Sequence, residues 1–203
     1  MTSAASAALV SLGTARLASA MRFVGAEPYR PRLTIAMATS GWSTYQLRRQ
    51  LFSIGEDFWV QNAQGENAYK LDGKVLVLTK TFALQDLNGN EVARMQAEML
   101  TLRKTMDIER GGQVVATVKK AFFNVLSQSF SVEVKGDAEL EAQGDILNHE
   151  FQITSGGQVV ATISKQWFAA DFMYGIAIAP GQDEVLLLCI AISIDEMSER
   201  DRR

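Results

Sequence analysis

The heptapeptide GGQVVAT occurs twice in this chain, at residues 111–117 and again, unchanged, at residues 156–162. The likeness continues past each copy, because GGQVVATVKKAFF (111–123) returns 45 residues later as GGQVVATISKQWF (156–168). A Gly-Gly pair followed by Val and Thr residues is typical of a tight turn that leads into a β-strand. The repeat therefore predicts that one turn-and-strand unit is built more than once along the chain.

Weaker copies of this unit fill the sequence from residue 45 onward. GENAYKL begins at Gly65 and GNEVARM at Gly89, and polar turn segments separate short stretches rich in Val, Ile, Phe and Thr. Turn glycines recur about every 23 residues, a spacing that holds two strands and two turns, so each unit is predicted to be a β-hairpin. These glycines are Gly65, Gly89, Gly112, Gly136, Gly157 and Gly181.

The number of hairpins predicts a closed sheet. Five or six hairpins in series give ten to twelve antiparallel strands, and closing such a sheet into a barrel removes its two exposed edges. The LxxLxL pattern of leucine-rich repeats is absent, and a propeller needs a longer chain. A barrel of about twelve strands is too wide for its own side chains to fill. Its lumen therefore needs an occupant.

The most apolar stretch of the chain, VLLLCIAISI at 185–194, can supply that occupant. It is too short to cross a membrane, which takes about 20 apolar residues, so no transmembrane span is predicted. Periodicity does not separate a buried helix from a buried strand here, and the Ile content favours a strand. A helix that is apolar all round must be buried on every side, and a barrel lumen buries it. We therefore favour a central helix over a strand.

Composition and charge limit the functional classes. The 203 residues suffice for one barrel domain, expected over 42–203, and the net charge of −3 argues against nucleic acid as a partner. Residues 1–41 are expected to be an N-terminal extension, since residues 1–40 are rich in Ala and Ser and hold one acid, Glu27. A flexible tail or a start assigned too early is favoured there, with a transit peptide as the alternative.

No pattern of catalytic residues is visible. Cys189 is the single cysteine and lies inside the apolar run, so it is expected to be an inert core thiol. The one histidine, His149, lies at the start of a predicted strand, and the usual nucleotide-binding, hydrolase and zinc motifs are absent. The chain is therefore expected not to be an enzyme, to need no cofactor or metal, and to work in the cytoplasm.

The order of these segments resembles the LURP-one-related family, which is similar in fold to the tubby C-terminal domain and the phospholipid scramblases. The resemblance covers roughly residues 45–197 and implies a twelve-stranded barrel around a C-terminal helix. It implies little about activity, because fold does not determine function. The matching segments lie at 51–86, 88–95, 111–123, 134–154, 156–168 and 183–195.

The resemblance also implies a type of ligand. Tubby domains bind phosphoinositides through basic residues on the barrel surface, and the corresponding candidates here are Lys119, Lys120, Lys165, Arg103 and Lys104. Neighbouring residues of a strand point to opposite faces, so Lys119 and Lys120 are not expected to share one ligand.

The expected role is a non-enzymatic tubby-like barrel that binds a phosphoinositide or other anionic lipid headgroup, or a protein, at the periphery of a membrane. The alternative is a scramblase-like membrane-associated protein. The short apolar run speaks against that alternative, and the acidic segment DEMSERD (195–201) lacks the ligand pattern of a calcium loop.

Overall fold

The structure is a computed structural model that describes residues 41–48, 57–75, 80–98, 101–121, 128–136, 139–145, 150–164 and 173–199. These residues form twelve strands and one helix. The expected N-terminal extension lies almost entirely outside the described residues, so its boundary at residue 41 stays a prediction.

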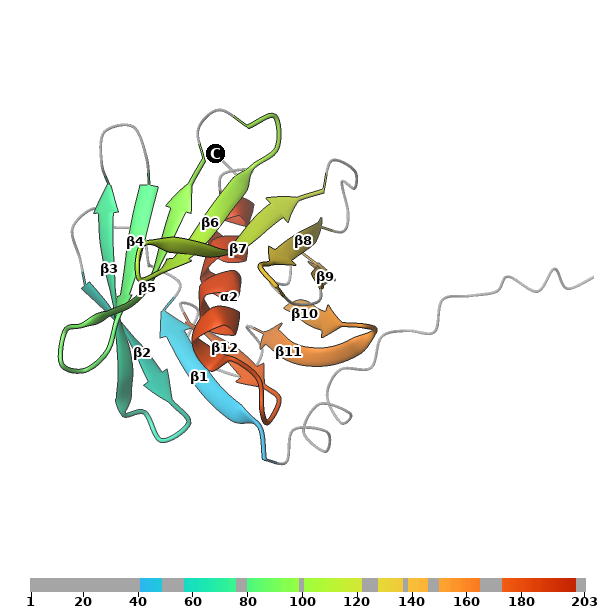
Figure 1. The fold of residues 1–203 in the computed structure, drawn as a ribbon. Coiled ribbons are helices and arrows are strands. Elements are labelled where there is room, and N and C mark those ends of the chain that lie inside the picture. Colours follow the sequence, from blue (N-terminus) through green and yellow to red (C-terminus); the bar gives the residue numbers. More distant parts are fainter. Residues whose placement is uncertain are drawn as a thin grey trace, which may run out of the picture.

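The twelve strands form one closed antiparallel barrel in which each strand pairs with its neighbours along the chain, and β12 pairs back onto β1 (Figure 1). The predicted barrel and its strand number are therefore confirmed. The strands are β1 (Ser43–Arg48), β2 (Asp57–Asn62), β3 (Asn67–Val75), β4 (Lys80–Gln85), β5 (Glu91–Ala97), β6 (Thr105–Arg110), β7 (Gln113–Lys120), β8 (Gln128–Val134), β9 (Leu140–Asp145), β10 (Glu150–Ser155), β11 (Gln158–Ser164) and β12 (Met173–Ile178).

The two identical heptapeptides build the same turn. Gly111 and Gly112 have φ angles of 57° and 76°, and Gly156 and Gly157 have φ angles of 55° and 82°. Two consecutive positive φ angles define the type I′ turn, whose twist matches that of the flanking strands. In both hairpins the register shifts by one residue just before the turn, which marks a β-bulge.

The weaker copies turn through longer loops, each with one positive-φ glycine and a side-chain cap. In the β2–β3 turn, Asn62 Oδ1 accepts hydrogen bonds from the backbone N–H groups of Gln64 and Glu66, at 3.0 and 2.9 Å. In the β4–β5 turn, Asp86 Oδ1 accepts equivalent bonds from the second and fourth residues after it. Register shifts precede both of these turns as well. The sequence repeat is thus a repeat of one bulged hairpin.

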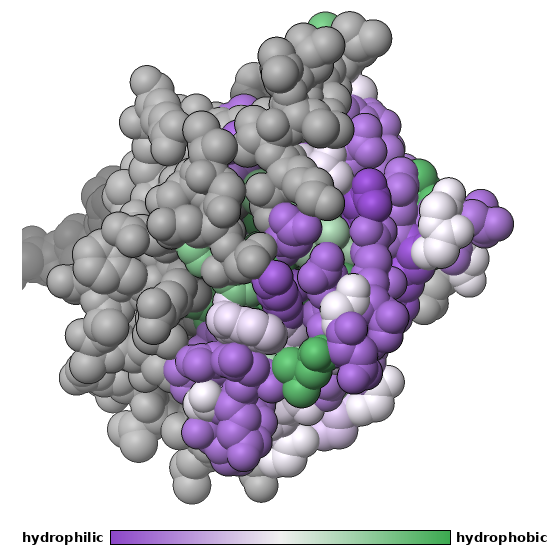
Figure 2. Space-filling view, turned by 90° about the vertical axis from the view of Figure 1, so that its left-hand side faces the viewer, coloured by the Kyte–Doolittle hydropathy of each residue, from purple (hydrophilic) through white to green (hydrophobic). Residues whose placement is uncertain are grey.

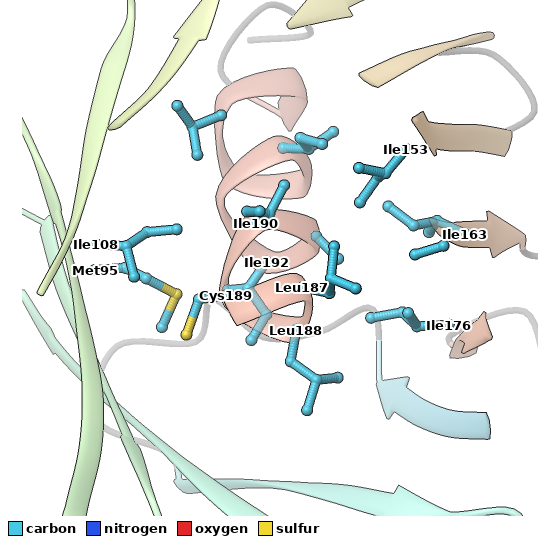
Figure 3. Packing of buried hydrophobic residues seen from close by; sticks show 14 of the residues in the cluster. Met95, Ile108, Ile153, Ile163, Ile176, Leu187, Leu188, Cys189, Ile190 and Ile192 are labelled. Atoms are coloured by element: carbon cyan, nitrogen blue, oxygen red, sulfur yellow. The ribbon is translucent and has the colours of Figure 1, made fainter. Parts of the chain in front are cut away.

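The helix α2 (Glu184–Glu199) occupies the lumen (Figure 1). Met95 and Ile108 pack on one side of it and Ile153, Ile163 and Ile176 on the other, so the helix is surrounded by inward-facing strand residues (Figure 3). The helix favoured from the apolar run is therefore confirmed, and the strand alternative is wrong. Alternation along the strands places apolar side chains inward. The outer surface seen in Figure 2 is mainly hydrophilic, with isolated hydrophobic residues.

Candidate functional site

The two ends of α2 are held to the barrel by different groups of residues. At its N-terminus, Asp183 caps the helix, since its Oδ1 accepts the backbone N–H of Leu186 at 3.0 Å. Arg110 of β6 donates two hydrogen bonds to the same carboxylate, at 2.6 and 2.7 Å. These hydrogen bonds from Arg110 lower the pKa of Asp183 below its usual range. A bidentate ion pair thus fixes the start of the helix to one barrel wall.

A second contact fixes this end of α2 to the strand that closes the barrel. Glu184 accepts hydrogen bonds from the hydroxyl groups of Ser43 and Tyr45, the latter at 2.5 Å. Burial, followed by the hydrogen bond to Glu184, raises the pKa of Tyr45 above its usual value. All five of these side chains have a structural partner. We therefore assign the N-terminal end of α2 to stability and look to the other end for a binding site.

At the C-terminal end, lysines from the strands contact the last turns of the helix. Lys80 Nζ of β4 lies 2.7 Å from Glu196 Oε1, and the Glu196 side chain is only 1% exposed. Lys104 Nζ, just before β6, donates a hydrogen bond of 3.3 Å to the backbone carbonyl of Met197. Positive charge is favourable at a helix C-terminus, where the carbonyl groups carry partial negative charge. Lys80 thus compensates the buried charge of Glu196, one of the acids that follow the apolar run.

The five basic residues proposed from the sequence do not form one cluster. Lys120 lies beside Lys104, because its backbone N–H donates to the Lys104 carbonyl at 3.0 Å, and Arg103 adjoins both at the same barrel end. Lys119 faces the other way, and its Nζ lies 2.6 Å from Glu133 on β8. The expected separation of Lys119 from Lys120 is therefore present. Lys165 lies outside the described residues.

A hollow of 240 Å³ opens at this end, between the β5–β6 connection and the end of α2. Its floor is apolar, and Arg103 and Lys104 contribute positive charge to its wall. Leu102, at its mouth, is 98% exposed. The apolar floor consists of Ala97, Met106 and Met197, all buried.

Acidic side chains line the same hollow. Glu196 belongs to its inner part, and Glu98 stands at the base of the β5–β6 connection, where its backbone N–H donates to the Thr105 carbonyl at 3.0 Å. A hydrogen bond with Asp107 raises the pKa of Glu98, because two neighbouring carboxyl groups resist ionising together. Asp107 also accepts a hydrogen bond of 2.7 Å from the Thr117 hydroxyl. The Glu98 carboxyl therefore lies with Asp107 and Thr117 on the outer face of the strands, whereas Glu196, at the inner part of the hollow, is paired with Lys80 at 2.7 Å.

Sequence reasoning missed Lys80, Leu102, Glu98 and Met197 as parts of this end. A signal for one of them was present, because Lys80 precedes Lys104 by 24 residues, about one hairpin period, and so recurs at the same barrel end. Among the described residues, no group of three or more His, Cys, Asp or Glu side chains is arranged to hold a metal ion. In the same part of the chain, no helix is both long and apolar enough to span a bilayer.

Comparisons with known proteins agree with this architecture. The sequence model of the family described as LURP-one-related matches residues 43–195. The X-ray structure of an Arabidopsis thaliana protein, AT5G01750, superposes with a TM-score of 0.55 at 15% sequence identity, covering 76% of this chain and 90% of that one. At that identity the likeness concerns the fold alone. A comparison with curated protein sequences finds no significant match.

Proposed function

The chain belongs to the LURP-one-related family, and on that premise we propose that it is a non-enzymatic binding module that docks on an anionic phospholipid surface from the cytoplasm. The docking end is the one that holds the C-terminus of α2. The observation that carries the proposal is the pairing of a fully exposed Leu102 with Arg103 and Lys104 directly after it. An apolar tip beside positive charge suits the interface of an anionic membrane.

The surroundings of Leu102 distinguish it from an ordinary exposed leucine. Leu87, in the β4–β5 turn at the opposite barrel end, is 61% exposed, but its neighbours are Asp86, Asn88 and, further on, Glu91. Negative charge there opposes approach to an anionic surface. Isolated exposed leucines are common and need no function. The combination of an exposed leucine with adjacent positive charge therefore distinguishes Leu102, and Leu87 serves as its control.

The test is co-sedimentation with phosphatidylcholine vesicles with and without an anionic lipid, either phosphatidylglycerol or a phosphoinositide. Wild type should pellet with anionic vesicles and be released as salt rises, because the attraction is screened. Leu102→Glu and Arg103→Glu should each weaken pelleting by about tenfold or more, since each adds repulsion at the contact. Leu87→Glu adds the same charge at the other end and should pellet nearly as wild type.

Three results would contradict the proposal: no pelleting at low salt, equal loss in Leu87→Glu and Leu102→Glu, or pelleting that ignores vesicle charge. The absence of pelleting would favour the protein partner expected as the other type of ligand. A Lys119→Ala variant tests Lys119, one of the basic candidates that the family resemblance implies. We expect it to have little effect, because Lys119 faces the outer wall and is paired with Glu133 at 2.6 Å.

A further inference from the structure

The connection between β5 and β6 presents a hydroxyl group beside the proposed docking residues. Among the residues that the structure describes, Thr101 is the only exposed serine or threonine, and all others are buried or half-buried. It directly precedes Leu102, which is 98% exposed, and it lines the same hollow as Arg103 and Lys104. A protein kinase needs an acceptor hydroxyl that it can reach from outside the fold. Within the described part of the chain, Thr101 meets that need best.

The Thr101 hydroxyl also holds the tip of this connection. Its Oγ1 donates a hydrogen bond of 2.6 Å to the backbone carbonyl of Arg103, and Thr105 Oγ1 donates to the same carbonyl at 3.1 Å. Two hydroxyl groups thus fix the backbone between Leu102 and Lys104. A phosphate ester oxygen carries no hydrogen, so phosphorylation of Thr101 would remove the shorter of these two bonds.

Phosphorylation would change the charge of the docking segment at the same time. Residues 101–104 hold two positive charges, from Arg103 and Lys104, and no negative one. A phosphothreonine carries a charge of about −1.5 to −2 at pH 7, so the segment would become nearly neutral. Because positive charge is what attracts such a segment to an anionic leaflet, the modified tip would lose its electrostatic attraction to the membrane.

We propose that Thr101 is a phosphorylation site and that its phosphate releases the docking end from an anionic phospholipid surface. The inference rests on the proposed membrane docking and adds its regulation. A serine/threonine kinase supplies the phosphoryl group from ATP: Thr101 Oγ1 bonds to the γ-phosphorus, the bond from that phosphorus to the ADP oxygen breaks, and the hydroxyl proton passes to a carboxylate of the kinase. Arg103 and Lys104, two and three residues after the acceptor, suit a kinase with an acidic peptide groove.

The first measurement asks whether the folded protein accepts phosphate at this position. The protein is incubated with ATP and the catalytic domain of a protein kinase C, which prefers basic residues around its acceptor, and peptide mass spectrometry locates the phosphate. We expect it on Thr101. In Thr101→Val the same peptide, which also holds the buried Thr105, should stay unmodified. Circular dichroism checks that the variant folds.

The second measurement compares vesicle binding before and after kinase treatment. Phosphorylated wild type should partition about 25-fold more weakly onto phosphatidylcholine vesicles that contain phosphatidylglycerol, because two charges are offset and each contributes a factor of about five. Kinase treatment should not change the partition of Thr101→Val, which accounts for phosphate on other residues.

A pair of charge variants separates position from net charge. Thr101→Glu adds one negative charge and should weaken partition by about fivefold. Gln64→Glu makes the same change in the exposed β2–β3 turn, at the opposite barrel end, and should bind nearly as wild type.

The inference is overturned if Thr101 takes up no phosphate, if its phosphate leaves vesicle binding unchanged, or if Gln64→Glu binds as weakly as Thr101→Glu. In each case unmodified wild type still binds anionic vesicles and membrane docking stands. If the unmodified protein binds no anionic vesicle, the docking and its regulation are both excluded.

Discussion

Gly144 lies where β9 passes β10 so closely that a side chain has no room. A Cβ atom there would come within 2.0 Å of the Glu150 carbonyl oxygen and 2.6 Å of the Phe151 ring. Gly144→Ala should therefore lower the free energy of unfolding by about 3 kcal/mol, because backbone must move. At Gly89 no atom lies within 4 Å of an added Cβ, so in Gly89→Ala only the positive φ of 83° causes strain. We expect this variant to lose about 1 kcal/mol of the free energy of unfolding. Urea denaturation checks both, and equal losses would refute the steric account.

Cys189 makes the free energy of unfolding depend on pH in the alkaline range. Burial raises the pKa of its thiol to about 12, so the folded state holds the proton more tightly than the unfolded chain does. A raised pKa adds stability that is complete below the unfolded pKa and is lost as the pH rises toward the folded one. The free energy of unfolding should therefore fall between about pH 9 and pH 12, by up to about 1.4 kcal/mol per pH unit from this group. Cys189→Ala should show a shallower fall, and an unchanged slope would exclude the thiol as the cause.

At the scale of elements, the start of α2 gives a prediction at acid pH. Arg110 depresses the pKa of Asp183, so this carboxylate stabilises the fold above its unfolded pKa and ceases to do so as the pH falls through the folded value. Asp183→Asn keeps a capping oxygen but loses the ion pair, so it should cost about 0.5–1 kcal/mol at pH 7. At a pH well below the folded pKa of Asp183, the variant and wild type should be equally stable. A loss that is constant with pH would show that capping, rather than charge, is responsible.

The end of α2 depends on the contact between Lys80 and the buried Glu196, at 2.7 Å. Lys80→Met should cost about 3 kcal/mol, because it removes a cation from a buried carboxylate. Adding Glu196→Gln should restore part of that loss, giving a coupling energy above about 1 kcal/mol in a double-mutant cycle. The exposed pair Arg94–Glu91, at 2.6 Å, should show a coupling energy of about 0.5 kcal/mol or less. Equal coupling energies in the two cycles would show that burial of Glu196 does not strengthen the ion pair.

For the molecule as a whole, α2 supplies the centre of the core. Leu188, Cys189, Ile190 and Ile192 are all 0% exposed, and a twelve-stranded wall cannot fill its own lumen. A chain ending at residue 182 should therefore lose its near-ultraviolet circular dichroism and bind the dye ANS, the behaviour of a compact state without fixed packing. A peptide of residues 183–203 added in trans should restore part of the signal. A native-like spectrum without the peptide would contradict this.

Sequence reasoning reached the barrel because its signals are local. A glycine pair, a bulge and an alternating strand recur at one period, and each can be recognised without knowing its partners. The binding end depends instead on which strand face is inside and which strand ends meet. Lys119 and Lys120 were predicted to diverge, but only the burial of Val118 shows that Lys120, two residues on, shares the inward face of β7. Leu102 carried no signal, because exposed and buried leucines look alike in a sequence.

The pairing of β1 with β12, in which Ser43 lies opposite Ile178, also determines when the barrel can close. During synthesis β1 is made first and β12 only after ten intervening strands. This pairing therefore joins the first and the last strand of the barrel. Contacts so distant along the chain slow folding to roughly the millisecond-to-second range seen for β-rich domains. The nascent chain thus carries an apolar inner wall with no helix to cover it until Glu184–Glu199 has been synthesised. That interval is where we expect chaperones to act on this protein and where temperature-sensitive variants should fail.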